Sequence, residues 1–268
     1  MAGLFDRIRS ALSGGATRSA EPVSPAPPPP PPPPVDEIAM QSMARRDAFW
    51  AKIGIVETDV LGHLISPSFM GGPHWPTTRQ AYRVIRREEG STLIATDGMS
   101  DPFTGGGDVN GFECELFIET ADLTPDVAGS VGVIDPLKHS WAFELLSHVA
   151  GMIAEAGGAK PQFDLYGALS MEVPGVSQST AIKQVLPGRF VTDDDALGIL
   201  IGGPAPDFPE RIEDMPLSPV RLLPIVILTA AELEVVRNGG RAARDAMVSR
   251  LSATPTAHRS SLSRTSVV

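Results

Sequence analysis

The stretch 91-STLIATDGMSDPF-103 runs from an apolar strand into a short turn that is acidic and carries a hydroxyl group. The preceding stretch 82-YRVIRR-87 reads as a strand too, and Glu88-Glu89-Gly90 between the two predicts a β-hairpin. A third strand, 112-FECELFIE-119, alternates between two faces. Its core face holds Phe112, Cys114, Leu116 and Ile118, and its acidic face holds Glu113, Glu115, Phe117 and Glu119. The three strands predict a sheet with one buried face and one acidic face.

Helices are expected before and after these strands. Residues 36–52 read as a helix, and residues 139–156 place apolar side chains at helical spacing until Gly157-Gly158 ends the run. Further strands are expected at 163–171, 197–201 and 220–228. Since strands and helices mix without regular βαβ alternation, the predicted class is α+β, with a mixed, largely antiparallel sheet packed with helices.

The last predicted helix has recognisable ends. Thr229 with Glu232 three positions later forms a capping-box sequence at its start. Gly239-Gly240 is expected to break this helix, and 241–251 supplies a final one.

Composition divides the chain into four segments. Residues 1–13 can form a short amphipathic helix that touches a membrane surface or a partner groove, although isolated helices of this length are marginal in water. Residues 14–35 form a Gly/Pro-rich linker with an unbroken proline run, which favours a polyproline II spacer over an SH3-type ligand. The main domain spans 36–252, and the Ser/Thr-rich tail 253–268 is expected to be disordered.

Charge and cysteine content limit the function classes. Residues 36–252 contain 17 basic and 30 acidic residues, a net charge of −13, which would repel nucleic acid and attract a basic protein. The alternative is that this negative charge only keeps the protein soluble and serves no binding function. The single cysteine, Cys114, leaves no internal disulfide and no cysteine cluster for zinc. No long apolar run or secretion signal is recognisable, so a cytoplasmic location is the default expectation.

No catalytic or metal-binding constellation stands out, and no cofactor is predicted. A nucleophile elbow needs glycine on both sides of the serine, and Pro102 follows Ser100 where the second glycine belongs. The glycine run at 105–107 lacks the lysine of a phosphate loop. The histidines are not paired at helical spacing, and 193–195 lacks the pattern of a calcium loop.

Several motifs, in order, resemble the Suppressor of fused family. They are 94-IATDGMSDPF-103, 111-GFECELFIET-120, 141-WAFELLSHVAGMIAEAG-157, 162-QFDLYGALSMEVPG-175 and 222-LLPIVILTAAELEVVRNGGRAARDAMVSRL-251. The chain departs from the family at Asp97 and at Glu113, where the family usually has glycine, and it lacks the second lobe of the animal protein. The resemblance covers roughly residues 55–251.

The resemblance implies a non-catalytic module that sequesters a protein partner, by adding a partner strand to an exposed sheet edge. Single-lobed bacterial members look like immunity proteins, so neutralisation of a basic toxin domain is the more specific expectation. Gly98 is expected to permit the turn, and Ser100 and Asp101 to hold it. The expected partner-contacting or motif residues are Asp97, Gly98, Ser100, Asp101, Asp108, Glu113 and Glu115.

Two other function classes stay open. One is an enzyme that uses the acidic residues around Asp97–Asp108. The other is an adaptor whose segment 1–13 docks elsewhere while the proline run acts as a spacer. The oligomeric state and the identity of the partner are not predicted.

Overall fold

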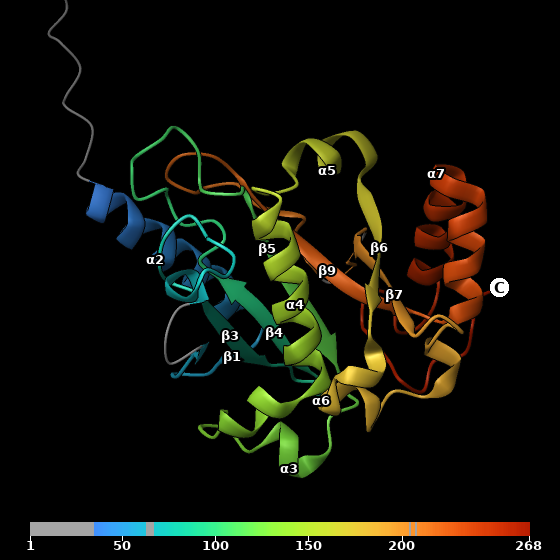
Figure 1. The fold of residues 1–268 in the computed structure, drawn as a ribbon. Helices are drawn as coiled ribbons and strands as arrows, with labels where there is room; N and C mark the ends of the chain where they lie inside the picture. Colours follow the sequence, from blue (N-terminus) through green and yellow to red (C-terminus); the bar gives the residue numbers. More distant parts are fainter. Residues whose placement is uncertain (1–34, 63–66, 204, 207) are drawn as a thin grey trace, which may run out of the picture. The chain divides into compact units, whose positions relative to one another are not determined.

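The computed structural model describes residues 35–62, 67–203, 205–206 and 208–268. These residues belong to one compact unit, which continues to the last residue (Figure 1). The predicted segment 1–13 and all but the end of the linker 14–35 lie outside the described residues. Within the described ranges, no helix is both long enough and apolar enough to cross a membrane.

A nine-stranded sheet with the order β1-β3-β4-β5-β9-β7-β6 forms the centre of the fold, with β2 beside β3 and β8 beside β9. Its strands are β1 (Ile55–Val56), β2 (Leu61–Gly62), β3 (Ala81–Arg86), β4 (Thr92–Asp97), β5 (Cys114–Thr120), β6 (Ala168–Pro174), β7 (Ala196–Gly202), β8 (Arg211–Ile212) and β9 (Val220–Leu228). The pair β5–β9 is parallel and the other ladders are antiparallel. This confirms the predicted α+β class with a largely antiparallel sheet.

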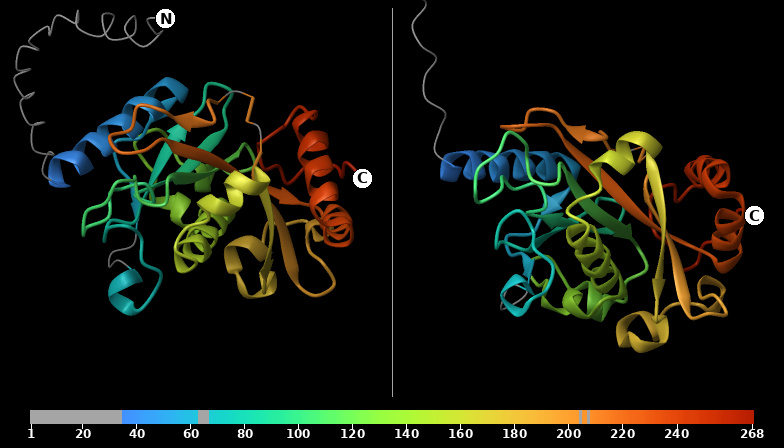
Figure 2. Two further views of the ribbon diagram at one scale, coloured as in Figure 1. Left: turned by 90° about the horizontal axis from the view of Figure 1, so that it is seen from above. Right: turned by 45° about the horizontal axis from the view of Figure 1, so that its top comes forward.

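Helices cover both faces of the sheet (Figure 2). The α-helices are α2 (Val35–Ile53), α3 (Pro125–Ala128), α4 (Trp141–Glu155), α5 (Lys160–Tyr166), α6 (Thr180–Lys183) and α7 (Ala230–Ser252). The 3₁₀ turns are η1 (Pro67–Met70), η2 (Asp135–His139), η3 (Val176–Gln178) and η4 (Gly188–Phe190). Helix α4 packs on one face, while α2 and α7 pack on the other, over the first and second halves of the sheet.

Local sequence explains the best-predicted elements. The hairpin β3–β4 forms as expected, with Ala81 opposite Asp97 and Arg86 opposite Thr92. Helix α4 starts where Ser140 accepts a hydrogen bond from the backbone N–H of Phe143. At the start of α7, Thr229 and Glu232 form the predicted capping box. The same helix breaks its regular geometry at Gly240, as expected.

Three predictions are wrong. Residues 163–171 do not form one strand, because 160–166 are the helix α5 and β6 begins only at Ala168. The outer face of β5 is not an exposed acidic face, because α2 covers it and every residue of the strand is buried.

The tail 253–268 is not disordered either. Arg264 pairs with Glu232 at 2.5 Å, and His258 Nε2 lies 2.9 Å from Glu119 Oε2. The hydroxyl of Ser260 donates to the carbonyl of Ile225 at 2.9 Å, beside β9. These buried polar contacts hold the tail against the sheet, and the domain therefore extends beyond residue 252.

Candidate functional site

Five of the seven predicted site residues lie together, but inside the protein. Asp97 ends β4, Gly98, Ser100 and Asp101 form the following turn, and Glu115 lies on β5. The four polar residues are each at most 3% exposed. The prediction that they contact a partner directly is therefore wrong, because no partner atom can reach them in the folded chain.

The centre of this cluster is Arg46 from α2, whose side chain is fully buried. Its Nε donates to Asp97 Oδ1 at 2.9 Å, and its Nη2 donates to Asp101 Oδ1 at 2.5 Å. Its Nη1 donates to the hydroxyl of Ser100 at 3.1 Å, and Glu115 Oε1 lies 3.7 Å from its Nε. One guanidinium group thus links the first helix to the turn after β4 and to β5.

Two further arginines complete the charge balance around Asp97. Arg83 Nε lies 2.9 Å from Asp97 Oδ2, and the Nη2 of Arg79 donates to the same oxygen. Burial alone would raise the pKa of Asp97, but the hydrogen bond from Arg79 and the three positive charges outweigh burial and lower it to about 2. Asp97 is therefore a firmly ionised structural anion and a poor general base near neutral pH.

Glu115 has the opposite electrostatic character. Burial raises its pKa, and the charge of Arg46 only partly compensates for it. Its Oε1 accepts from the backbone N–H groups of Gly98 and Ser100 at 3.2 and 3.0 Å, and from the Ser100 hydroxyl at 2.6 Å. The turn is thus held by a carboxylate of the neighbouring strand, where we had expected Ser100 and Asp101 to hold it.

Gly98 has the role that its sequence context predicted. Its φ is +142°, and a Cβ at this position would lie 2.7 Å from the carbonyl oxygen of Arg79. A side chain here would therefore clash with fixed backbone.

The other two predicted site residues lie apart from the cluster. Asp108 is exposed in the loop between β4 and β5. Glu113 is partly exposed just before β5 and borders a small cavity with Arg211 and Arg221. Neither of them joins the Arg46 cluster, so the seven predicted site residues do not form one surface.

Sequence reasoning missed the arginines of this cluster. The signal was spacing in the predicted helix 36–52, where Ser42, Arg46 and Trp50 recur every four residues and are all buried. An arginine on an otherwise inward-facing helical stripe indicates a buried ion pair.

Metal and thiol chemistry receive no support from this geometry. Within the ranges that the structure describes, no three His, Cys, Asp or Glu side chains are arranged to hold a metal ion. Cys114 is buried, and burial raises the pKa of its thiol. It is therefore a core residue rather than an exposed nucleophile.

A different feature offers a binding surface, the outer edge of β6. This strand ends the sheet order, and among the described residues it pairs only with β7. Just beyond it, the N–H of Gly175 donates to the carbonyl of Asp195 at 2.9 Å, in the same register as the ladder. Because hydrogen-bonded pairs alternate in an antiparallel ladder, the odd-numbered residues of β6 bond to β7. The N–H and C=O groups of Ser170 and Glu172 therefore point away from β7.

The β9 side of the sheet supports the same assignment. The carbonyl of Ile225 and the N–H of Ile227 bond to the hydroxyl of Ser260, on the side away from β7. The backbone N–H and C=O groups of even-numbered β9 residues therefore point towards β7, where they bond to even-numbered residues. The backbone groups of the odd-numbered β7 residues then point towards β6. No backbone bond from the described residues outside the ladders reaches Ser170 or Glu172.

The surroundings of this edge are partly apolar and partly acidic. A cavity of about 240 Å³ lies beside Ser170 and Glu172, with Leu233 and Val236 of α7 in its wall. The loop 193–195 continues the register past the end of the strand and carries three aspartates. The free edge of β6, this cavity and the acidic loop together form what we call the β6 edge.

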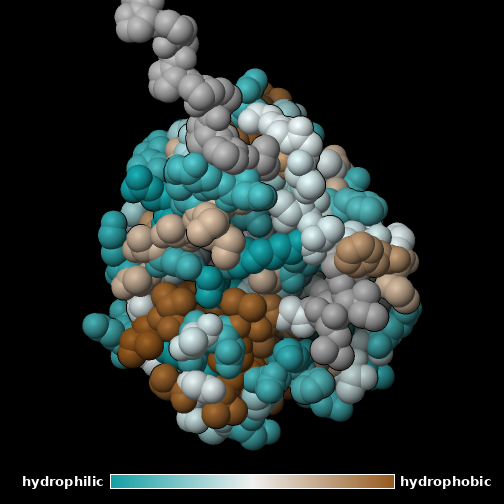
Figure 3. Space-filling model, turned by 90° about the vertical axis from the view of Figure 1, so that its left-hand side faces the viewer, coloured by the Kyte–Doolittle hydropathy of each residue, from teal (hydrophilic) through white to brown (hydrophobic). Residues whose placement is uncertain are grey.

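An apolar surface lies at the other end of the sheet (Figure 3). There the loop 129–134 meets β1, because the N–H of Gly132 donates to Glu57 Oε2 at 2.8 Å. The exposed apolar side chains of these two segments and of the residues after β1 are Ile55, Val60, Val131 and Val133. Exposed apolar clusters of this kind are typical of surfaces that contact another protein.

Comparisons with protein-family models and with curated proteins find no match to this sequence. The resemblance to the Suppressor of fused family therefore stays a prediction.

Proposed function

We propose that this chain is a non-catalytic protein-binding module of the Suppressor of fused type, which sequesters a protein partner by pairing with a partner strand at the β6 edge. The observation that carries the proposal is the pair of outward backbone positions at Ser170 and Glu172. In the more specific form of the proposal, the partner is a basic toxin domain, and the chain is a cytoplasmic immunity protein.

Strand addition suits the chemistry of this edge. Ser170 and Glu172 each offer one N–H donor and one C=O acceptor, so a partner strand of a few residues gains up to four backbone hydrogen bonds. Pro174 ends the strand and offers no N–H, which limits pairing to a short segment. Natural edge strands avoid unspecific pairing by being short and by carrying charged side chains. The short β6 edge with the charged Glu172 has both features.

The side chains of the β6 edge indicate what the partner strand carries. The cavity beside Leu233 and Val236 suits one apolar side chain. Glu172 is already paired with Arg237, and Arg237 also contacts Asp194 at 3.1 Å, so the free charge is that of Asp193 and Asp195. The N–H and hydroxyl of Ser177 are bonded to Asp195, which leaves Asp193 as the most available carboxylate. An extended segment with an apolar residue followed by a basic residue fits this pattern.

The test uses peptides selected from a random heptapeptide library against the full-length chain. The selected peptide is titrated against wild type, Ser170→Pro and Ser170→Ala. Ser170→Pro removes an outward N–H without removing a bond to β7, so affinity is expected to fall at least tenfold. Ser170→Ala keeps the N–H, so its affinity is expected to stay within about twofold of wild type.

Hydrogen exchange on the wild-type chain gives a reading that does not depend on how Ser170→Pro folds. Bound peptide is expected to slow exchange at the amides of Ser170 and Glu172. Selection of no binding peptide, or of peptides that protect other amides and bind both variants equally, would refute strand addition at β6. For the immunity form, the neighbouring gene should encode a basic toxin-like protein whose complex with this chain weakens as salt is raised.

A further inference from the structure

A gap in the sheet lies where β7 parts from β9. In β7, Ile201 is opposite Ile225, whereas in β8 Arg211 is opposite Arg221. The two registers differ by six residues, so β7 and β8 do not continue one another along β9. Gly202 and Gly203, both at positive φ, start this departure. The N–H of Leu222 still donates to the carbonyl of Glu210 at 2.9 Å, so in the described part of the chain the pairing along this edge of β9 is interrupted at Leu223 and Pro224.

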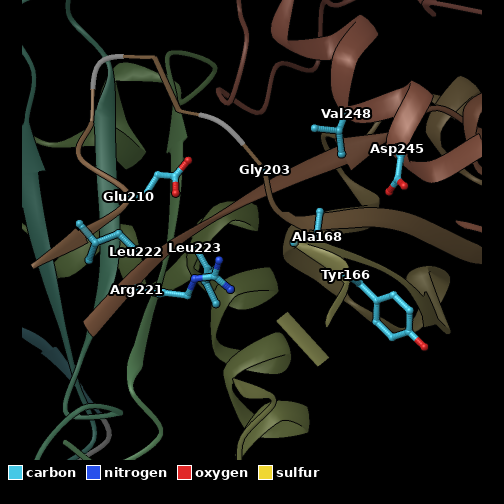
Figure 4. A pocket seen from close by; sticks show the side chains of 10 residues that line it. Tyr166, Ala168, Gly203, Glu210, Arg221, Leu222, Leu223, Asp245 and Val248 are labelled. Carbon is cyan, nitrogen blue, oxygen red and sulfur yellow. The ribbon is translucent and has the colours of Figure 1, made fainter. Parts of the chain in front are cut away.

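A cavity of about 320 Å³ fills this gap (Figure 4). Its apolar walls come from Ala168 of β6, Leu222 and Leu223 of β9, and Val248 of α7. Its charged groups are Arg221, Glu210 and Asp245. Figure 4 shows Glu210 and the guanidinium group of Arg221 on one side of the cavity, and Asp245 of α7 on the other side.

Arg221 is incompletely paired. Its Nη1 is buried and has no hydrogen-bond partner. The nearest carboxylate oxygen, Asp164 Oδ1, is 3.6 Å away, and Asp164 is itself bound by Lys160 at 2.5 Å. The Arg221 side chain as a whole is 21% exposed and lines the cavity, so a bound carboxylate is expected to meet its exposed atoms rather than Nη1.

The two carboxylates differ in how far they are neutralised. Asp245 lies 3.6 Å from Arg241 and 3.8 Å from Arg244, whereas Glu210 forms no ion pair within 4 Å with any of the described residues. Glu210 is therefore the carboxylate left for a bound cation, and Arg221 is a second charged group that lines the cavity. The wall opposite them is fixed, because Arg241 and Arg244 both lie over the ring of Tyr166, at 5.3 and 5.1 Å from its centroid.

We propose that this cavity binds a free α-amino acid with a short apolar side chain. Its carboxylate accepts from Arg221, its ammonium group pairs with Glu210, and its side chain contacts Ala168, Leu223 and Val248. The cavity is open to solvent and has a volume of about 320 Å³, at the low end of small-molecule sites, which suits a small ligand such as leucine. A phosphate would be repelled by Glu210, and a metal cation would be repelled by Arg221.

The test is a calorimetric titration of the full chain with L-leucine, 4-methylpentanoate and leucinamide. The last two lack the ammonium group and the carboxylate, respectively. Leucine is expected to bind at least tenfold more tightly than either analogue, because only leucine satisfies both charged groups. Equal binding of 4-methylpentanoate would overturn the assignment of Glu210, and no leucine binding at millimolar concentration would overturn the site.

Two variants locate the binding. Arg221→Gln is expected to weaken leucine binding at least tenfold, whereas Arg211→Gln, the register partner on β8 that does not line the cavity, should leave it within about twofold. Val248→Phe narrows the cavity from α7 and should abolish binding without changing the charges. Unchanged leucine affinity in both Arg221→Gln and Val248→Phe would show that leucine binds elsewhere and would refute the proposal. Because peptide binding at the β6 edge is measured separately, failure here leaves strand addition standing.

Discussion

Replacing Arg46 with methionine tests whether the acidic cluster is a structural element. The substitution keeps an unbranched side chain on α2 and removes the charge that meets Asp97, Asp101 and Glu115. Arg46 is fully buried, so water cannot take over its contacts. Breaking a buried pair by removing one partner costs about 3–5 kcal/mol.

The individual contacts show where this cost arises. Asp97 keeps Arg83 at 2.9 Å and also keeps Arg79, and Asp101 keeps Arg79 at 3.8 Å. Among the described ion pairs, Glu115 has Arg46 as its cation, so it is the carboxylate that the substitution leaves without a counter-charge. A loss of about 3–5 kcal/mol would be a large part of the roughly 5–15 kcal/mol that stabilises a typical domain.

The pH dependence of this loss has a defined sign. Glu115 has a raised pKa in the folded state, so it favours folding more at low pH and less as pH rises. Removing Arg46 raises this pKa further, and the deficit of the variant should therefore shrink as pH falls from 8 to 5. Asp97, with its pKa lowered to about 2, contributes about 2 kcal/mol that is lost only as pH falls from about 4 towards 2. Measurements between pH 5 and 8 thus isolate Glu115.

Urea unfolding of wild type, Arg46→Met and Arg45→Met measures these differences. Arg45 is the matched control, since it is next in the same helix but forms an exposed pair with Asp214. Its loss should cost less than about 1 kcal/mol at any of these pH values. If Arg46→Met is no less stable than Arg45→Met, or if its deficit grows as pH falls, the cluster does not hold the fold together as argued.

Three further outcomes are expected from other parts of the structure. Thr229→Ala removes the side chain that accepts from the N–H of Glu232, and it should lower the free energy of unfolding by about 1 kcal/mol in urea titrations. Ending the chain after Ser252 leaves Glu232 without Arg264 and should cost at least 3 kcal/mol by thermal or urea unfolding; unchanged stability would mean that the tail does not pack in solution. Cys114 should react with a thiol reagent only as fast as the chain opens, so immediate labelling of the folded protein would contradict its burial.

The sequence predicted the elements whose signals are local. The hairpin β3–β4, helix α4 and the capping box at Thr229 depend on alternation, helical spacing and two residues three positions apart. The strand β6 was misplaced because 163-FDLYGALSM-171 mixes apolar and polar residues without a clear period. The break lies at Gly167, whose φ of +74° ends α5 before β6 begins.

What the sequence did not predict are contacts between distant segments. Alternation in β5 separated two faces correctly, but it could not show that α2 covers the acidic one. The tail looked disordered because Ser and Thr dominate it, yet His258, Ser260 and Arg264 each meet a buried partner. Composition measures how much apolar surface a segment can bury, and it does not register polar groups that are satisfied by pairing.

These contacts also limit where the protein can bind anything. Helices cover both faces of the sheet, and the acidic turn is closed by Arg46, so neither a face nor that turn can meet a partner. Three places that the described chain leaves accessible are the two ends of the sheet and the gap between β7 and β8. At β6 the accessible groups are backbone donors and acceptors, which suit a strand; at β1 they are apolar side chains, which suit a packed surface. The gap between β7 and β8 adds a cavity with apolar walls and the charged side chains of Arg221 and Glu210, which suits a small dipolar molecule. Because each location offers a different chemistry, substitutions at Ser170 and Arg221 should affect peptide and leucine binding independently.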